Sequence, residues 1–228
     1  MPEHHGRKYH LNESFFERWS SIMAYVLGFW FADGYIRKEK SYRIVIVSND
    51  IQILRAIRDC RGSNCPIVKR LKPDRSSSIV FHSKRLYESL IAHGGMRRKS
   101  HLIRFPNVPK EYIRDFIRGY FDGDGSVFFV EYIRTKDGRL TRELRTNFIS
   151  GSKKFLEDLM MVLNKEIGLS IKRVGIYSVG ISLKLGYGMK DSDALLHYMY
   201  YKDFPIGLRR KADFLSRIPT YQKHNISR

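Results

Sequence analysis

The sequence lacks the features that mark several common protein classes. It has two cysteines, Cys60 and Cys65, which are too few for a disulfide framework and belong to no second Cys-x-x-Cys or His-x-His set that would indicate zinc. No apolar run reaches the roughly 18 to 20 residues that span a bilayer, and the longest, around residues 22–32, is followed by an aspartate. The N-terminal MPEHHGRKYH has no signal-peptide core. We therefore expect a protein that is not secreted and acts in the cytoplasm.

Acidic residues are scarce relative to basic ones. The 228 residues include 42 Lys and Arg against 23 Asp and Glu, which gives a formal net charge of +19 and a pI near 10.0. Such a charge favours a polyanionic partner, with nucleic acid as the main expectation and an anionic membrane surface as the competitor. The apolar fraction of 43% is enough for one large domain or for two compact halves of about 100 residues each.

Three sequence blocks recur in the same order and indicate a tandem duplication. Residues 24–34 align with 115–125 and pair Gly28 with Gly119 and Asp33 with Asp124. Further blocks also align: SNDIQILRAI (48–57) with SGSKKFLEDL (150–159), and GMRRKS (95–100) with GLRRKA (207–212). Matched blocks in the same order are the signature of an internal repeat.

Each copy has the same expected order of elements, so we predict an α+β fold. Apolar spacing and β-branched runs predict a helix, two strands, a helix, two strands and a final helix per copy. The expected helices span 14–33, 50–60 and 83–93 in the first copy and 110–123, 152–166 and 191–200 in the second. In the second copy the first strand pair flanks an Asp137-Gly138 hairpin turn. The expected boundaries are a basic N-terminal arm 1–11, a first half 12–103, a linker 104–110 that contains two prolines, a second half 111–219 and a C-terminal tail 220–228.

Small residues stand four positions apart on one face of each motif helix. They are Gly28 and Ala32 in the first copy and Gly119 and Gly123 in the second. Residues four apart lie one above the other on a helix, and without side chains there two helices can approach until their backbones touch. We expect Gly28 and Gly119 to lie at a helix interface between the two halves.

An aspartate follows each small pair, so the same packing would place Asp33 beside Asp124. The next residue in each copy, Gly34 or Gly125, suits the left-handed conformation that ends many helices. Two carboxylates about 5 Å apart repel by roughly 3 kcal/mol at an effective dielectric near 20. Mg²⁺, which takes carboxylate, phosphate and water oxygens, would relieve that repulsion. The alternative, that each aspartate only caps a turn, is weakened by its recurrence. The counterpart of Asp122 is a phenylalanine, so a role needed from both halves cannot depend on it.

The segments VLGFWFADG (26–34) and IRGYFDGDG (117–125) resemble the signature of the LAGLIDADG homing endonucleases, in the single-chain form with two motifs. The resemblance extends from about Asn12 to Pro219. It implies two pseudo-symmetric α-β-β-α-β-β-α halves that pack through the two motif helices, with antiparallel sheets that form a saddle over DNA. It also implies that Asp33 and Asp124 are the catalytic, metal-binding acids.

Further roles are implied only by this resemblance. The metal would be Mg²⁺, with Mn²⁺ as a substitute, and the backbone carbonyls of Ala32 and Gly123 would contact it. A basic residue late in each repeat would lie near the scissile phosphate, which points to Lys99 and Lys211 in the RRK triplets. These lysines would stabilise charge on the phosphate or position the attacking water. The alternative is that the triplets only bind the phosphate backbone.

A two-stranded β-ribbon fits the major groove of DNA, and every second side chain then faces the bases. The expected DNA-binding residues are Arg37, Lys38, Lys40, Arg43, Lys69, Arg70, Lys72, Arg75, Arg134, Lys136, Arg139, Arg142, Arg145, Lys172 and Arg173. Many of them would neutralise phosphates without reading sequence.

The expected function is a monomeric, site-specific homing endonuclease that makes a metal-dependent double-strand break in a long asymmetric DNA target and so promotes intron mobility. The expected location then extends to an organelle or nucleoid, wherever the host intron DNA lies. The alternative is an RNA-binding maturase that helps intron RNA to splice, with or without DNA cleavage.

Overall fold

The computed structural model describes residues 9–38, 41–69, 76–172, 174–176 and 182–218, which form two halves with one order of elements. The first half contains α1 Ser21–Asp33, β1 Gly34–Lys38, β2 Tyr42–Ser48, α2 Ile51–Cys60, β3 Ile67–Lys69, β4 Ser77–His82 and α3 Lys84–Ala92. The second half contains α4 Ile113–Asp124, β5 Gly125–Ile133, β6 Leu140–Ser150, α5 Lys153–Ile167, β7 Gly175–Ile176, β8 Leu183–Tyr187 and α6 Met189–Met199. Short helices follow or precede these units: η1 Lys99–His101, η2 Lys110–Tyr112, α7 Arg209–Ala212 and η3 Leu215–Arg217. The predicted α+β class and the α-β-β-α-β-β-α order of each half are confirmed.

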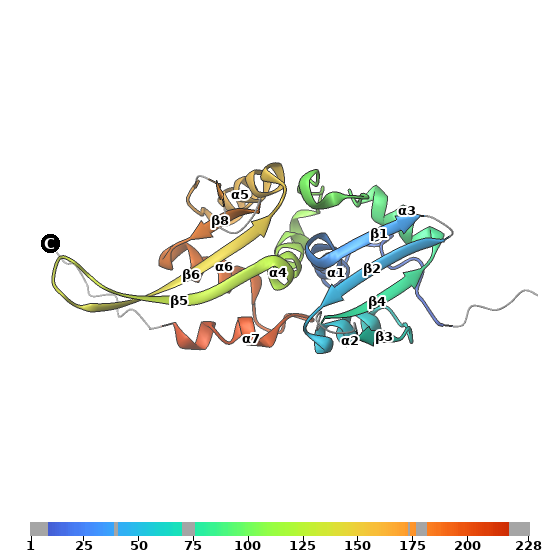
Figure 1. Ribbon diagram of the computed structural model, residues 1–228, viewed down its shortest axis with the longest axis horizontal. Coiled ribbons are helices and arrows are strands. Elements are labelled where there is room, and N and C mark those ends of the chain that lie inside the picture. The colour runs from blue at the N-terminus through green and yellow to red at the C-terminus, as the bar shows by residue number, and fades with distance from the viewer. Residues whose placement is uncertain (1–8, 39–40, 70–75, 173, 177–181, 219–228) are drawn as a thin grey trace, which may run out of the picture.

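Helices α1 and α4 pack against each other at the centre of the molecule, between the two sheets (Figure 1). A Cβ atom on Gly28 would lie 2.0 Å from the carbonyl oxygen of Phe116, and one on Gly119 would lie 2.0 Å from that of Tyr25. Each glycine therefore admits the backbone of the other helix, and the two contacts are reciprocal. Both glycines thus lie where the two motif helices cross.

Helix α1 begins at Ser21, so the predicted start at residue 14 is wrong. The Ser20 hydroxyl accepts a hydrogen bond from the Met23 amide at 3.1 Å and caps the helix. Residues 13–17 form turns, and their apolar side chains serve to pack in the core and not to build a helix face. Phe16 is 1% exposed and packs in the core, with its ring 5.1 Å from the buried guanidinium of Arg61.

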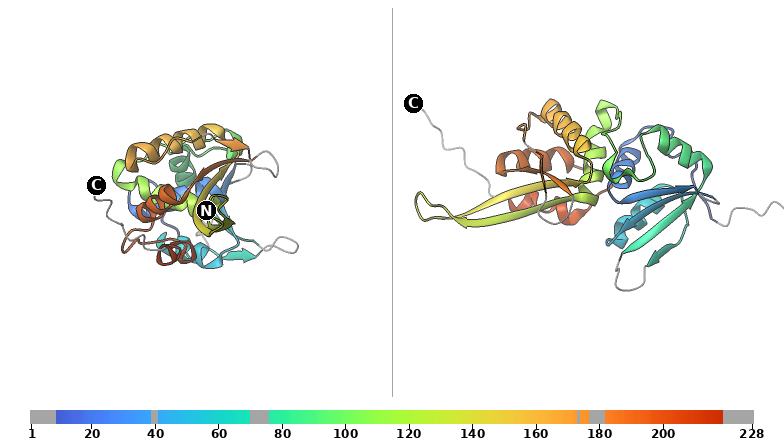
Figure 2. Two further views of the ribbon diagram at one scale, coloured as in Figure 1. Left: turned by 90° about the vertical axis from the view of Figure 1, so that its left-hand side faces the viewer. Right: turned by 45° about the horizontal axis from the view of Figure 1, so that its top comes forward.

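The two sheets have matching strand orders, β1-β2-β4-β3 and β5-β6-β8-β7, and every pairing is antiparallel. Buried side chains alternate along the strands: Leu144, Thr146 and Phe148 of β6 face the helices, whereas Arg145 and Asn147 lie on the open face. In Figures 1 and 2 the strand pairs β1–β2 and β5–β6 lie on the same side of the central helices. The fold therefore presents two uncovered sheet faces to one side.

Strands β5 and β6 form a ribbon that extends well beyond their sheet (Figures 1 and 2). They pair from Gly125 with Phe148 to Ile133 with Leu140, whereas β8 pairs only with residues 146–150 of β6. The predicted turn closes the ribbon, with Gly138 at φ +66°. In the first half the equivalent strands are shorter, at 5 and 7 residues against 9 and 11.

The glycines that follow the motif helices are extended, so the predicted left-handed conformation is wrong. Gly34 has φ −104° and Gly125 has φ −95°. The need for glycine is steric instead: a Cβ on Gly34 would lie 2.2 Å from the Trp30 ring, and one on Gly125 would lie 2.2 Å from the Phe121 ring. The chain therefore passes from each helix directly into a strand beneath an aromatic side chain of the last helical turn.

Cys60 and Cys65 are free thiols, with Cys65 buried, as expected for packed residues. None of the helices within the described ranges is long and apolar enough to cross a membrane.

Candidate active site

Asp33 and Asp124 end the two central helices and lie close together. A Cβ on Gly123 would lie 3.2 Å from the Asp33 carboxylate, which places that carboxylate against the last turn of the other motif helix. Burial, and then the charge of Asp124, raise the pKa of Asp33 to about 6. Burial also raises the pKa of Asp124. Burial is the main cause of both shifts, and for Asp33 the charge of Asp124 adds to it.

The lysines of the two RRK triplets cap the same two helices. The Lys99 ammonium donates to the carbonyl oxygens of Phe31 at 2.5 Å and Ala32 at 2.7 Å. The Lys211 ammonium donates to the carbonyl oxygen of Phe121 and to those of Asp122 at 3.1 Å and Gly125 at 2.7 Å. Each lysine therefore satisfies backbone oxygens that a helix leaves without partners at its C-terminus.

Both lysines are buried, at 8% and 4% exposed, and burial lowers the pKa of each to about 8. Nearby carboxylates oppose this shift and favour the charged ammonium: Asp124 and Asp33 for Lys99, and mainly Asp122 for Lys211. Two acids and two lysines, one of each from each half, thus form one charged cluster at the seam, which is the interface between helices α1 and α4. The structure brings together all four residues that the sequence predicts to be catalytic.

The free donors of the two lysines differ. Lys211 uses three N–H groups on three carbonyl oxygens, so it acts as a fixed positive charge. Lys99 donates to two carbonyl oxygens among the described residues and retains one N–H for another acceptor. The two halves therefore carry the same residue type at this position but, counting the contacts of the described residues, only Lys99 has an N–H group left to donate to a ligand.

Asp122 has a structural role that its sequence position does not reveal. Its buried carboxylate accepts hydrogen bonds from the Tyr25 hydroxyl at 2.8 Å, the Tyr200 hydroxyl at 2.6 Å and the Leu208 amide at 2.8 Å. Burial raises its pKa. The bond to Leu208 fixes the segment that leads into α7 and so positions Lys211.

The oxygen donors of the cluster suit a hard divalent cation. The two carboxylates lie near each other and that of Asp33 lies against Gly123, while the Ala32 carbonyl oxygen accepts a hydrogen bond from Lys99. Within the described part of the chain, no group of three or more His, Cys, Asp or Glu side chains could hold a metal. A metal here would need water or phosphate oxygens as its other ligands, which is how Mg²⁺ is bound in most phosphate-processing sites.

The predicted DNA-binding residues occupy the surface in different ways. Arg37 and Arg43 are cross-strand neighbours on the open face of the first sheet. Arg145 lies on the open face of the second sheet. Arg142 lies on the opposite face of the ribbon from Arg145, where its guanidinium stacks 3.9 Å above the Phe129 ring. Lys38 lies on the opposite face of its strand from Arg37, with its ammonium 5.1 Å from the Tyr42 ring.

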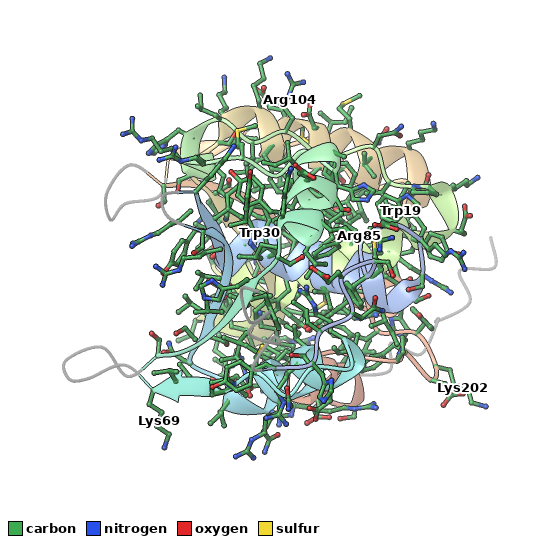
Figure 3. All side chains as sticks on the ribbon, turned by 90° about the vertical axis from the view of Figure 1, so that its right-hand side faces the viewer. Trp19, Trp30, Lys69, Arg85, Arg104 and Lys202 are labelled. Carbon is green, nitrogen blue, oxygen red and sulfur yellow. The ribbon has the colours of Figure 1, made fainter. Side chains whose placement is uncertain are left out.

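Other predicted contacts lie at the edges. Arg134, Lys136 and Arg139 are exposed at the tip of the long ribbon, and Lys69 points outward from the end of β3 (Figure 3). Lys172 forms an ion pair with Asp191 at 3.8 Å. Several predicted residues lie outside the described part of the chain: Lys40, Arg70, Lys72, Arg75 and Arg173.

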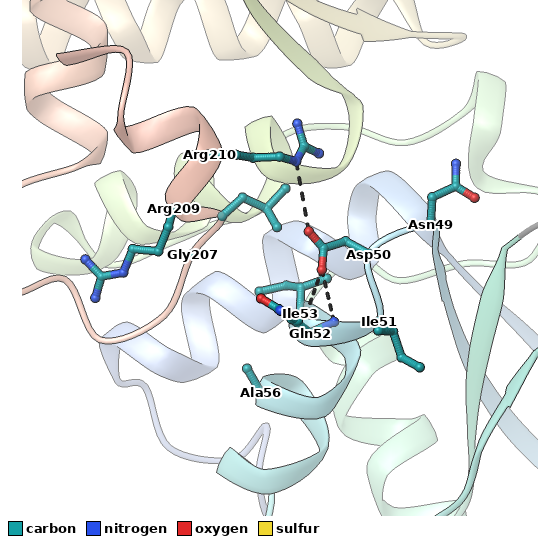
Figure 4. A pocket seen from close by; sticks show the side chains of 10 residues that line it. Asn49, Asp50, Ile51, Gln52, Ile53, Ala56, Gly207, Arg209 and Arg210 are labelled. Atoms are coloured by element: carbon teal, nitrogen blue, oxygen red, sulfur yellow. Dashed lines mark hydrogen bonds and ion pairs between the residues drawn. The ribbon is translucent and has the colours of Figure 1, made fainter. Parts of the chain in front are cut away.

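Two cavities lie along the segment that carries Lys211, and the sequence predicted neither. The larger, about 720 Å³, lies between the start of α2 and the segment before α7 (Figure 4). Asp50 and Arg210 face each other across it at 3.9 Å. The smaller, about 380 Å³, lies beside Gly123 and Gly125 and is lined by Arg210, Lys211 and Arg217 among others. The RRK triplet was a signal for Arg210, whereas Arg217 has no motif of its own.

Comparison with known proteins supports the fold but does not assign the sequence to a family. No family model matches the sequence. Two curated relatives, the probable translation initiation factors IF-2 of Methanocaldococcus jannaschii and Thermococcus kodakarensis, are each 29% identical over 154 and 156 residues, which is 64% of this chain. The chain spans only 11% and 12% of the length of these relatives.

Several solved structures are similar in fold to this chain. The meganuclease I-SmaMI bound to uncleaveable DNA matches with a TM-score of 0.60 at 12% identity, over 86% of this chain and 88% of that one. The I-LtrWI LAGLIDADG homing endonuclease bound to target DNA matches with 0.57 at 12%, over 86% and 87%. Variants of the homing endonuclease I-DmoI match with 0.57 at 19%, over 88% and 99%. This chain therefore has the fold of the LAGLIDADG homing endonucleases, with both motif helices in a single polypeptide.

Proposed function

We propose that this protein is a site-specific DNA endonuclease that makes a double-strand break in a long, asymmetric target and supports homing of its intron. The observation that carries the proposal is the cluster of Asp33, Asp124, Lys99 and Lys211 at the seam between two sheets whose open faces look the same way. Two related centres in one chain match a reaction that must be performed twice, once on each strand.

The reaction would be hydrolysis of one phosphodiester per strand. A water oxygen forms a bond to phosphorus, the bond from phosphorus to the 3′ oxygen breaks, and a 5′-phosphate and a 3′-hydroxyl remain. The proton lost by the water passes to solvent, and the departing 3′ oxygen takes a proton. Lys99 and Lys211 offset the negative charge that grows on the phosphate, since both are held in place by carbonyl oxygens before DNA binds.

Mg²⁺, or Mn²⁺ in its place, would be held by Asp33 and Asp124 with the Gly123 carbonyl nearby and would supply activation of water and charge neutralisation at the phosphate. The raised pKa of Asp33 supports this assignment, because a cation would offset both the burial and the repulsion by Asp124 that raise it. The duplex would lie on the two open sheet faces, with Arg37, Arg43 and Arg145 directed at it.

The target is expected to span on the order of 20 base pairs, because each half would cover about one turn of the duplex. A monomer is sufficient, since both centres lie in one chain. Contacts from arginine and lysine to phosphates would make the affinity fall steeply with salt.

Incubation with a library of duplex sites in Mg²⁺ tests the proposal. Cleavage of both strands at one sequence, abolished in Asp33→Asn and Asp124→Asn, supports it. The Lys202→Ala variant, which removes an exposed charge elsewhere, should cleave normally. Absence of cleavage together with binding to intron RNA that survives both aspartate substitutions would refute the nuclease and identify a splicing factor.

A further inference from the structure

The segments that follow Lys99 and Lys211 begin alike and then differ. RRKSHLIRFP (97–106) and RRKADFLSRIP (209–219) each carry an arginine two residues before a proline, Arg104 in the first and Arg217 in the second. Duplication would give these arginines similar surroundings. Their surroundings in the structure are different.

Arg104 is held by an acid of the opposite half. Its guanidinium donates to both oxygens of Asp158 in α5, at 2.6 and 3.0 Å, and the Phe105 amide also bonds to that carboxylate at 3.4 Å. Such a bidentate ion pair between an arginine and a carboxylate holds the guanidinium in one orientation. Arg104 lies at the periphery above α5 (Figure 3). It is therefore directed away from the catalytic cluster.

Arg217 has no equivalent acid among the described residues. The aligned blocks SNDIQILRAI and SGSKKFLEDL pair Asp158 with Ala56, which cannot accept a guanidinium. Ala56 instead lines the 720 Å³ cavity that separates α2 from the segment before α7 (Figure 4). The second segment turns toward β5, where the Phe214 ring stacks on Phe129 with centroids 5.7 Å apart.

This different course places Arg217 beside the second catalytic centre. Its guanidinium lies 5.3 Å from the Phe214 ring, and both residues line the 380 Å³ cavity next to the end of α4. The other lining residues are Gly123, Gly125, Ser126, Val127, Arg210 and Lys211. Three cations and no acid line this space, so it favours an anion. Its volume equals that of about twelve waters, which is ample for a phosphate group.

Lys211 alone would hold that anion poorly. All three of its N–H groups already donate to carbonyl oxygens, whereas Lys99 keeps one N–H. We propose that the cavity binds one DNA phosphodiester of a single strand and that Arg217 supplies the direct, charge-assisted contact that Lys211 cannot make. The corresponding arginine of the first copy, Arg104, is engaged by Asp158 and is therefore not available to the centre at Asp33.

The proposal rests on the proposed function and adds that the two strands are handled differently. Arg217 would be a phosphate-positioning residue for one strand only. Its removal would slow the cut in that strand and leave the other cut nearly unchanged. The product would then accumulate as nicked DNA before it becomes linear.

Strand-resolved cleavage of a supercoiled plasmid that carries one target site tests this inference. In Arg217→Ala, we expect cleavage of one strand to slow by about tenfold or more, as for loss of a charge-assisted contact, while the other strand changes by less than about twofold. Arg217→Lys should recover part of the rate. Lys202→Ala, a matched loss of one exposed positive charge, should leave both rates intact. Equal slowing of both strands, or no change in either, would overturn the inference.

A binding measurement in Ca²⁺ separates this inference from the proposed function, because it requires no cleavage. Single phosphates of the target are replaced by neutral methylphosphonates. For the wild-type protein, one position on one strand should weaken binding by roughly tenfold, and in Arg217→Ala the same replacement should have no further effect, as in a double-mutant cycle. Independent, additive losses at every position would refute the Arg217 contact even if the protein cuts DNA.

Discussion

The carboxylate of Asp124 lies close enough to that of Asp33 to help raise the pKa of Asp33 to about 6. Before DNA or metal binds, the seam of the molecule therefore holds an acid that favours its proton. The arrangement is unfavourable for the free protein, and a bound cation would relieve it.

Neutralising Asp33 should stabilise the metal-free protein. Its folded pKa lies above its unfolded value of 3.8, so between these values the folded state binds more protons and the free energy of unfolding falls as pH rises. At pH 7.5 in EDTA, Asp33→Asn should gain roughly 1 to 3 kcal/mol and melt a few degrees higher. Thermal unfolding from pH 4 to 7.5 checks this. An equal slope against pH in wild type and variant would contradict it.

The charge of the buried lysines should limit cleavage at high pH. Burial lowers the pKa of Lys99 and Lys211 to about 8, so each loses its positive charge as pH rises through that value. We expect kcat/KM to increase as pH rises through about 6, where Asp33 ionises, and to decrease as pH rises through about 8. A profile that stays level to pH 9.5 would show that the lysine charges do not contribute to the reaction.

Substitution at the helix crossing should be severe. Gly28→Ala or Gly119→Ala would place a methyl group 2.0 Å from a carbonyl oxygen of the other motif helix, so the helices must separate. We expect a loss of about 3 kcal/mol in the free energy of unfolding. Gly175→Ala, where a Cβ meets nothing within 4 Å, is the matched control and should be neutral. Urea unfolding of all three variants makes the comparison.

Asp122→Ala should loosen the segment that carries Lys211. Three hydrogen bonds are lost, including that from the Leu208 amide, and we expect a cost of about 2 to 4 kcal/mol. Hydrogen exchange should accelerate in residues 207–212. Asp213→Ala removes an exposed acid from the same segment and should leave their exchange unchanged. Normal protection in Asp122→Ala would exclude the positioning role.

The long β5–β6 ribbon should extend the protected DNA on one side of the target. Removing the pairs Tyr132–Thr141 and Ile133–Leu140 shortens the ribbon by about 7 Å, given a rise of about 3.4 Å per residue. The hydroxyl-radical footprint should then shrink by about two base pairs on that side only. An unchanged footprint would show that the ribbon tip does not touch DNA.

The sequence predicted the duplication, the strand and helix order and the proximity of Asp33 to Asp124, because each depends on local pattern or on a repeated block. The place of Lys99 and Lys211 beside them was implied only by the family resemblance. Gly28 and Gly119 could be assigned to an interface since small residues four apart have one main use in a helix. The start of α1 could not be predicted, because Phe16 is apolar for a tertiary reason: it packs in the core.

Contacts between residues far apart in the chain account for the rest. The sequence predicts a left-handed backbone at Gly34, which is wrong; glycine is needed there because the Trp30 ring leaves no room for a Cβ. The role of Asp122 depends on Tyr200 and Leu208, which lie more than 70 residues away. Arg104 and Arg217 have different surroundings because the first copy's arginine meets Asp158, whereas the residue aligned with Asp158 is Ala56, which cannot bind an arginine. The sequence does not show that Arg104 and Asp158 are in contact.

The reciprocal contact of Gly28 and Gly119 has a consequence for engineering. Each motif helix presents the other with the same shallow backbone groove, so the seam is close to self-complementary. Either half cut free within residues 104–110 would have a surface suited to a second copy of itself, and halves taken from different proteins of this architecture could be joined with little redesign of the junction. The specificity of a chimaera could then be changed one half at a time.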